Sequence, residues 1–84
     1  MKIEKASQRG KTTVRLSGDF QAEHIAELNK QLQDNGPPCV LDLTEVTVVD
    51  VEVVRFFGAC EANGVKIVHC PRYIREWMNR ERKP

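Results

Sequence analysis

The chain has 84 residues, of which 40% are hydrophobic and 30% are charged, with a formal net charge of +1. This is a globular rather than a disordered composition, and a chain of this length supports one core, so we expect a single domain over residues 1–84. The small net charge gives no long-range attraction to nucleic acid or an anionic membrane, and no apolar run reaches the ~20 residues of a membrane span.

The N-terminus and the cysteines indicate the compartment. Residues Met1–Lys5 lack the apolar core of a signal peptide. The three cysteines, Cys39, Cys60 and Cys70, are odd in number and have no close pairing in the sequence, which suits a reducing environment better than a disulfide scaffold. We therefore expect a soluble cytoplasmic protein.

Two strands are expected at the N-terminus, over Met1–Lys5 and Thr12–Ser17, because apolar and polar residues alternate in the second of them. The polar segment Gln8–Lys11 contains a glycine and predicts a hairpin turn between them. Gly18 is expected to end the second strand, and Asp19 to cap the helix that follows.

The middle of the chain predicts a helix, a strand and a second helix. The apolar period becomes helical over Gln21–Asp34, and Asn35–Pro38 contains the glycine and prolines that end a helix. Cys39–Leu43 is a short aliphatic run between breakers, typical of a buried strand. A second helix is predicted over Val51–Ala62, ending at Asn63–Gly64, with Val53, Val54, Phe57, Ala59 and Cys60 able to face the sheet.

The C-terminal part predicts one more strand and one more helix. Val65–His69 has the composition of a strand, and Pro71 is suited to the first position of a helix. Ile74, Trp77 and Met78 have the spacing of an apolar helical stripe.

These elements give the order ββαβαβα. Strand–helix–strand units place their strands parallel, so we expect an α/β fold with a mostly parallel sheet of four to five strands and three helices, whose N-terminal strand is antiparallel.

Candidate catalytic and metal-binding residues lack the required spacing. Cys39, Cys60, His69 and Cys70 include no paired ligands such as C-x2-C, so we expect structural thiols and no metal. Neither His24 nor His69 has an evident activating environment for a cysteine nucleophile. The glycines form neither a dinucleotide fingerprint nor a P-loop. We expect no enzymatic activity and no cofactor.

The C-terminal helix carries a mainly basic polar face, which usually means solvation rather than nucleic-acid binding; its charged residues are Arg72, Arg75, Glu76, Arg80, Glu81, Arg82 and Lys83. Tyr73, Trp77 and Met78 are of the types that anchor protein interfaces. Closing the small core is the favoured role of Trp77.

The stretch around Asp50 carries a family resemblance. An apolar run ends at this carboxylate, which is well placed to cap the following helix. Together with Leu16–Phe20, Val40–Leu43 and Gly64–Val68, the segment Val48–Asp50 resembles, in order and spacing, the STAS domain family of anti-sigma-factor antagonists. The resemblance spans nearly the whole chain. It implies a STAS-like single domain that acts as a protein-interaction module, with an anti-sigma factor or another kinase-like bacterial regulator as partner.

The chain departs from the family pattern directly after Asp50. Family members carry a phosphorylated serine or threonine there, whereas this chain has Val51, which implies no phosphorylation at that position. Glu52 either supplies a fixed negative charge in place of the phosphate or simply favours the positive end of the helix, and the second reading is preferred. We expect Asp50, Val51, Glu52 and Arg55 to form the partner-binding surface.

A second hypothesis is an accessory subunit, or a domain that binds a lipid or a nucleotide, in a transport complex, as some STAS domains do. A homo-oligomer is a third possibility. What copurifies with the native protein discriminates among them.

Overall fold

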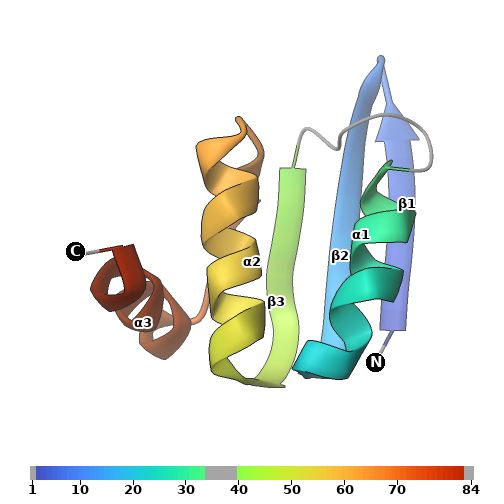
Figure 1. Ribbon diagram of the computed structural model, residues 1–84. Coiled ribbons are helices and arrows are strands. Elements are labelled where there is room, and N and C mark those ends of the chain that lie inside the picture. Colours follow the sequence, from blue (N-terminus) through green and yellow to red (C-terminus); the bar gives the residue numbers. More distant parts are fainter. Residues whose placement is uncertain (1, 34–39, 83–84) are drawn as a thin grey trace.

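The computed structural model describes residues 2–33 and 40–82 (Figure 1). Its elements follow the order ββαβαβα, which confirms the predicted fold class. They are the strands β1 (Lys2–Gln8) and β2 (Lys11–Phe20), the 3-10 helix η1 (Ala22–His24), α1 (Ile25–Gln33), β3 (Val40–Val49), α2 (Val51–Ala62), β4 (Lys66–Val68) and α3 (Arg72–Arg82).

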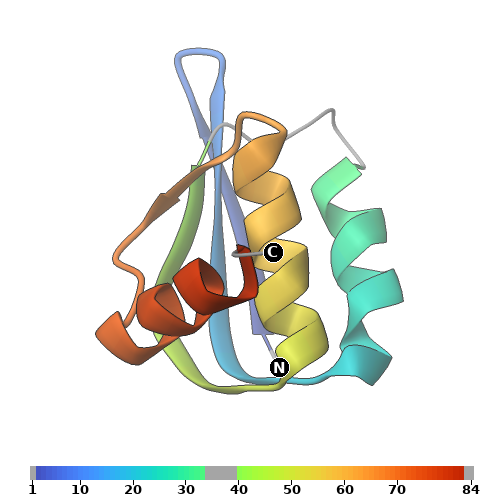
Figure 2. The same cartoon turned by 60° about the vertical axis from the view of Figure 1, so that its left-hand side comes forward.

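The four strands form one mixed sheet in the order β1-β2-β3-β4. β1 is antiparallel to β2, whereas β2, β3 and β4 are parallel, so the sheet is mostly parallel as expected. The three α-helices lie on one side of this sheet, with α1 and α2 next to each other and α3 beyond α2 (Figure 2). The described residues place no helix on the other face, which we call the open face.

The core lies between the sheet and the helices. The sheet contributes aliphatic residues from its helix side, and α2 contributes Val53, Val54 and Phe57, all nearly or fully buried. From the predicted stripe of α3, Ile74 and Met78 are buried. Trp77 is only partly buried but packs against this core, in agreement with its favoured role.

β2 is longer than predicted, because Gly18 does not end it. Gly18 has φ of 94°, which only glycine adopts readily, and the pairing with β3 shifts register beside it. The strand therefore bends and continues to Phe20, which is fully buried and pairs with Val49. The predicted cap at Asp19 is wrong: Gln21 is the N-cap of η1, and its backbone N–H donates to His24 Nδ1 at 3.0 Å.

The ends of the other strands also differ from the predicted ones, since strand pairing decides where each strand stops. β1 extends to Gln8, and the predicted hairpin turn is confirmed at Arg9–Gly10, where both φ angles are positive. β3 extends to Val49 because it keeps pairing with β2, whereas β4 is shorter than predicted and ends before His69, whose φ is 54°. Pro71 precedes α3 and its carbonyl accepts from Ile74 and Arg75, so it is not the first helical residue.

Parts of the predictions lie outside the described residues. These are Met1, the helix end and breakers over 34–38, Cys39 and Lys83; the side chain of Arg82 is likewise not described.

Candidate functional site

The turn between β3 and α2 is built by Asp50. Its Oδ1 accepts the backbone N–H of Val53 at 3.0 Å, which confirms the predicted N-cap. Its Oδ2 accepts the backbone N–H of Ala22 at 2.7 Å, so the same carboxylate also ties η1 to the start of α2. These hydrogen bonds, from Val53 and then Ala22, lower the pKa of Asp50 below its ordinary value of 3.8. The tie to Ala22 was not foreseen, because it joins segments far apart in the sequence.

The predicted partner-binding residues come together on the first turns of α2. Val51 is partly buried, and Glu52 and Arg55 are exposed. Arg55 Nη1 lies 3.2 Å from Glu52 Oε1, and Arg55 Nε lies 2.8 Å from Glu81 Oε1 on α3. The hydrogen bond and charge of Glu81 raise the pKa of Arg55. Partner binding by these residues stays a prediction, and the carboxylate of Asp50 is already used within the fold.

Two exposed apolar side chains adjoin this turn. Val48 is 53% exposed near the end of β3, and Tyr73 is 46% exposed on α3. The Tyr73 hydroxyl donates to the backbone carbonyl of Thr47 at 2.6 Å, which places α3 beside the last residues of β3. Val48 was not foreseen as exposed, because a β-branched residue in an apolar run reads as core. We use the name turn surface for Val48, Val51, Glu52, Arg55 and Tyr73.

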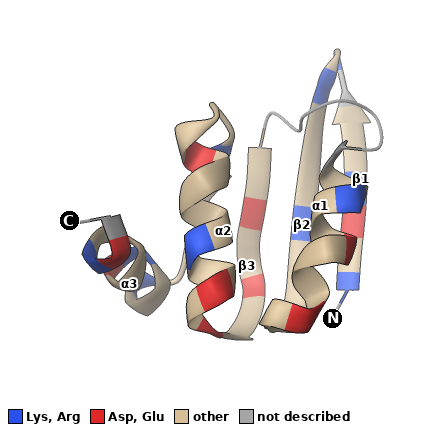
Figure 3. Cartoon of the chain, in the orientation of Figure 1, with Lys and Arg blue, Asp and Glu red and all other residues tan. Residues whose placement is uncertain are grey.

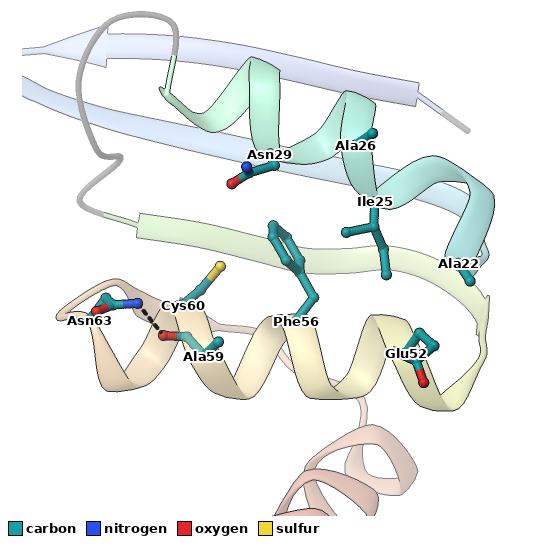
Figure 4. Close-up of a pocket in the computed structure, with 9 residues that line it drawn as sticks. All are labelled: Ala22, Ile25, Ala26, Asn29, Glu52, Phe56, Ala59, Cys60 and Asn63. Atoms are coloured by element: carbon teal, nitrogen blue, oxygen red, sulfur yellow. Dashed lines mark hydrogen bonds between the residues drawn. The ribbon is translucent and has the colours of Figure 1, made fainter.

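A groove lies between α1 and α2, with a volume of about 660 Å³ (Figure 4). One wall is formed by η1 and α1 and the other by α2; the lining residues are Ala22, Ile25, Ala26, Asn29, Glu52, Phe56, Ala59, Cys60 and Asn63. Ala59 was predicted as able to face the sheet, but it is exposed and lines this groove. Glu52 belongs both to the turn surface and to the groove, so the two features are continuous.

The buried carboxylate of Asp42 lies on the open face. It is only 5% exposed, and its Oδ1 accepts the Thr44 N–H at 2.9 Å and the Thr44 hydroxyl at 2.5 Å. Arg15 Nε lies 3.5 Å from Oδ2, and His69 Nδ1 lies 3.0 Å from the Thr44 hydroxyl oxygen. Since Thr44 gives its one hydroxyl proton to Asp42, His69 Nδ1 is the donor to Thr44.

This network explains the ionisation of Asp42. Burial raises its pKa, but the hydrogen bonds from Thr44 and the charges of His69 and Arg15 together outweigh burial, so the pKa is lowered. The backbone N–H of Thr44, two residues away, is thus one of the groups that satisfy the Asp42 carboxylate. The cluster is a satisfied structural network between β2, β3 and the end of β4.

Two arginines of the predicted basic face of α3 are paired with carboxylates. Arg75 Nη1 lies 3.0 Å from Glu61 Oε2, and Arg72 Nε lies 3.3 Å from Glu76 Oε1. These pairs offset the charges of Arg72 and Arg75.

Of the candidate metal-binding residues that the sequence offers, Cys60, His69 and Cys70 lie within the described part of the chain. Over residues 2–33 and 40–82, no three His, Cys, Asp or Glu side chains are grouped to hold a metal ion. Cys60 lies in the groove and Cys70 beside α3; both are free thiols, and burial raises the pKa of each. A raised thiol pKa lowers the thiolate fraction available as a nucleophile. Within the same ranges, no helix is long and apolar enough to cross a membrane.

The fold and the site define a small α/β domain whose α2 N-terminus is exposed and capped by an aspartate. A family model described as "Mlab, STAS domain" matches residues 3–78. The chain therefore belongs to the STAS domain family, whose members generally act as protein-interaction or ligand-binding modules. A search of curated proteins finds no match.

Proposed function

We propose that this chain is a non-enzymatic module that binds a protein partner through the turn surface. The observation that supports this is an exposed patch with apolar, acidic and basic groups, built on a turn whose own polar groups are satisfied by Asp50. Exposed apolar side chains beside charged ones are typical of interaction surfaces. The pairing of Arg55 with Glu81 holds one of these charged groups in place.

The partner class rests on the family resemblance. An anti-sigma factor with a kinase-like fold, or another component of a bacterial regulatory assembly in the cytoplasm, fits an antagonist that regulates transcription. Val51 has no hydroxyl to phosphorylate, so control of binding comes from competition between partners or from protein level.

The surroundings of Glu52 favour the simpler of the two hypotheses for this residue, in which its charge stabilises the helix N-terminus and does not replace a phosphate. Its carboxylate lies in the first turn of α2, where it suits the positive end of the helix dipole. Arg55 lies 3.2 Å from it and offsets its charge. A carboxylate that is already paired is a poor substitute for a phosphate, which carries nearly two charges.

The groove favours a second candidate function, in which the chain is an accessory subunit or binds a small lipid or nucleotide in a transport complex. Its volume of about 660 Å³ is within the range of small-molecule sites, about 300–1,000 Å³. A ligand that stays bound in native mass spectrometry of the purified chain is the expected sign of this function.

The test of the main proposal is affinity capture from the native cells with full-length tagged protein. Glu52→Lys is expected to reduce the captured partner by about tenfold or more, since it reverses an exposed charge of the proposed surface. The matched control is Glu4→Lys, the same charge change at an exposed position of β1. The proposal fails if Glu52→Lys captures the partner as well as the unchanged protein does, or if only a small molecule copurifies.

A further inference from the structure

We infer that the groove between α1 and α2 receives one amphipathic helix of the partner, with its basic residues at the end near Glu52. This inference rests on the proposed function and names the chemistry of the partner. The turn surface alone reaches only the first turns of α2, whereas the groove extends that surface along both α1 and α2.

The walls of the groove have the spacing and size that a third helix requires. Ala22 and Ala26 are one turn apart on one wall, and Ala59 lies on the other. Small side chains let helix axes approach to about 8–10 Å. Along α2 the lining runs from Glu52 to Asn63, which corresponds to a length of about 17 Å, or three turns of a docked helix.

The centre of the groove is apolar and its ends are polar. Phe56 and Ile25 point into it from opposite walls, and both are only partly buried (Figure 4). Asn29 and Asn63 lie toward one end and Glu52 at the other. A helix with an apolar stripe flanked by polar residues matches this arrangement, which is the helix-in-groove mode of recognition. An acyl chain has no group to pair with the polar ends.

The charge at the Glu52 end favours basic residues on the docked helix. Glu23 and Glu27 are exposed beside Ala22 and Ala26, and Figure 3 shows acidic residues on the ends of η1 and α2 nearest the Asp50 turn. Arg55 partly offsets Glu52, but its guanidinium also reaches Glu81 on α3, away from the groove. The net excess at this end is negative, although the whole chain carries +1.

A second copy of this chain is a poor occupant. The apolar faces of α2 and α3 are already buried against the sheet and each other, as the full burial of Phe57 and Ile74 shows, and Leu28 and Leu32 on α1 are buried too. Within the described residues no helix has an apolar stripe left to dock in the groove of another copy.

The test is a selection with the full-length protein as bait, using a display library of peptides of about 18 residues, long enough for the groove with flanking turns. Every position varies among Leu, Ala, Lys and Glu, so the library contains sequences with and without a helical apolar period. We expect enriched peptides to keep the helical apolar period and to carry excess Lys toward one end. Loss of the period, excess Glu or no enrichment overturns the inference.

Two variants locate the binding. Ala59→Trp fills the groove and is expected to weaken the selected peptides by about tenfold or more, whereas Ala62→Trp, on the same helix but outside the groove, leaves binding within about twofold. If Ala59→Trp does not fold, Ala26→Trp blocks the opposite wall. Equal binding of the peptides by Ala59→Trp and Ala62→Trp overturns the inference. The inference is also overturned if the protein binds oleate but not the peptides, and Ala59→Trp removes the oleate binding.

The same variants separate this inference from the proposed function. If Glu52→Lys loses the cellular partner but Ala59→Trp retains it, the proposed binding through the turn surface is supported and the inference about the groove is overturned. Loss of that partner by both variants supports both.

Discussion

Replacing Phe57 with alanine is expected to remove a large share of the stability of the chain. Phe57 is fully buried between α2 and the sheet, and truncating such a phenylalanine costs about 3–5 kcal/mol. A chain of 84 residues has an expected free energy of unfolding of about 4–13 kcal/mol, so this loss is a large share of the total. Urea unfolding followed by circular dichroism measures it.

The neighbouring Phe56 provides the matched control. It is only partly buried and points into the groove, so Phe56→Ala is expected to cost about 1–2 kcal/mol. An equal loss of stability in the two variants contradicts the assignment of Phe57 to the core and Phe56 to the groove.

Asp50→Ala is expected to lower the melting temperature by about 5–10 °C, because it removes the N-cap of α2 and the tie to η1 together. Asp50→Ser keeps a capping oxygen but cannot serve Val53 and Ala22 at once, so its loss is intermediate. Asp50→Asn also keeps one acceptor but turns an amide group toward one of the two N–H donors. Thermal unfolding of the series by circular dichroism gives the order.

The pH dependence of the Asp50 series provides a second check. The pKa of Asp50 is lowered in the fold, so its ionised form stabilises the protein above the unfolded value of 3.8, and that contribution is lost as the pH falls through the folded pKa. The gap between the unchanged protein and Asp50→Asn should therefore narrow in acid. A gap that stays constant below pH 3.8 speaks against the ionised cap.

The features that the sequence predicts correctly carry strong local signals. Asp50 stands between an apolar run and a helical period, so the cap and the bounds Val51–Ala62 follow from local chemistry alone. The element order follows in the same way from glycine and proline breakers. The STAS family, which the comparison confirms over residues 3–78, rests on the order of these local segments.

The features that the sequence misses depend on contacts between distant segments. β2 continues past Gly18 because Phe20 finds a core site and a pairing partner in Val49, and neither is visible in the local pattern. Ala59 is close to the boundary between the buried and solvent-exposed sides of α2, and only the position of α1 places it in a groove. The tie from Asp50 to Ala22 likewise requires the packed structure.

The most direct test of the partner surface is photo-cross-linking in the native cells with a benzoylphenylalanine introduced at single positions of the full-length protein. Val48 and Ala59 report on the turn surface and the groove; Ala6 and Lys66 report on exposed positions of β1 and β4, away from both. We expect Val48 and Ala59 to cross-link to the same protein, and Ala6 and Lys66 to give no cross-link to it. Cross-links from Ala6 or Lys66 alone, or a product with the mass of two copies of this chain, would contradict the proposed partner surface.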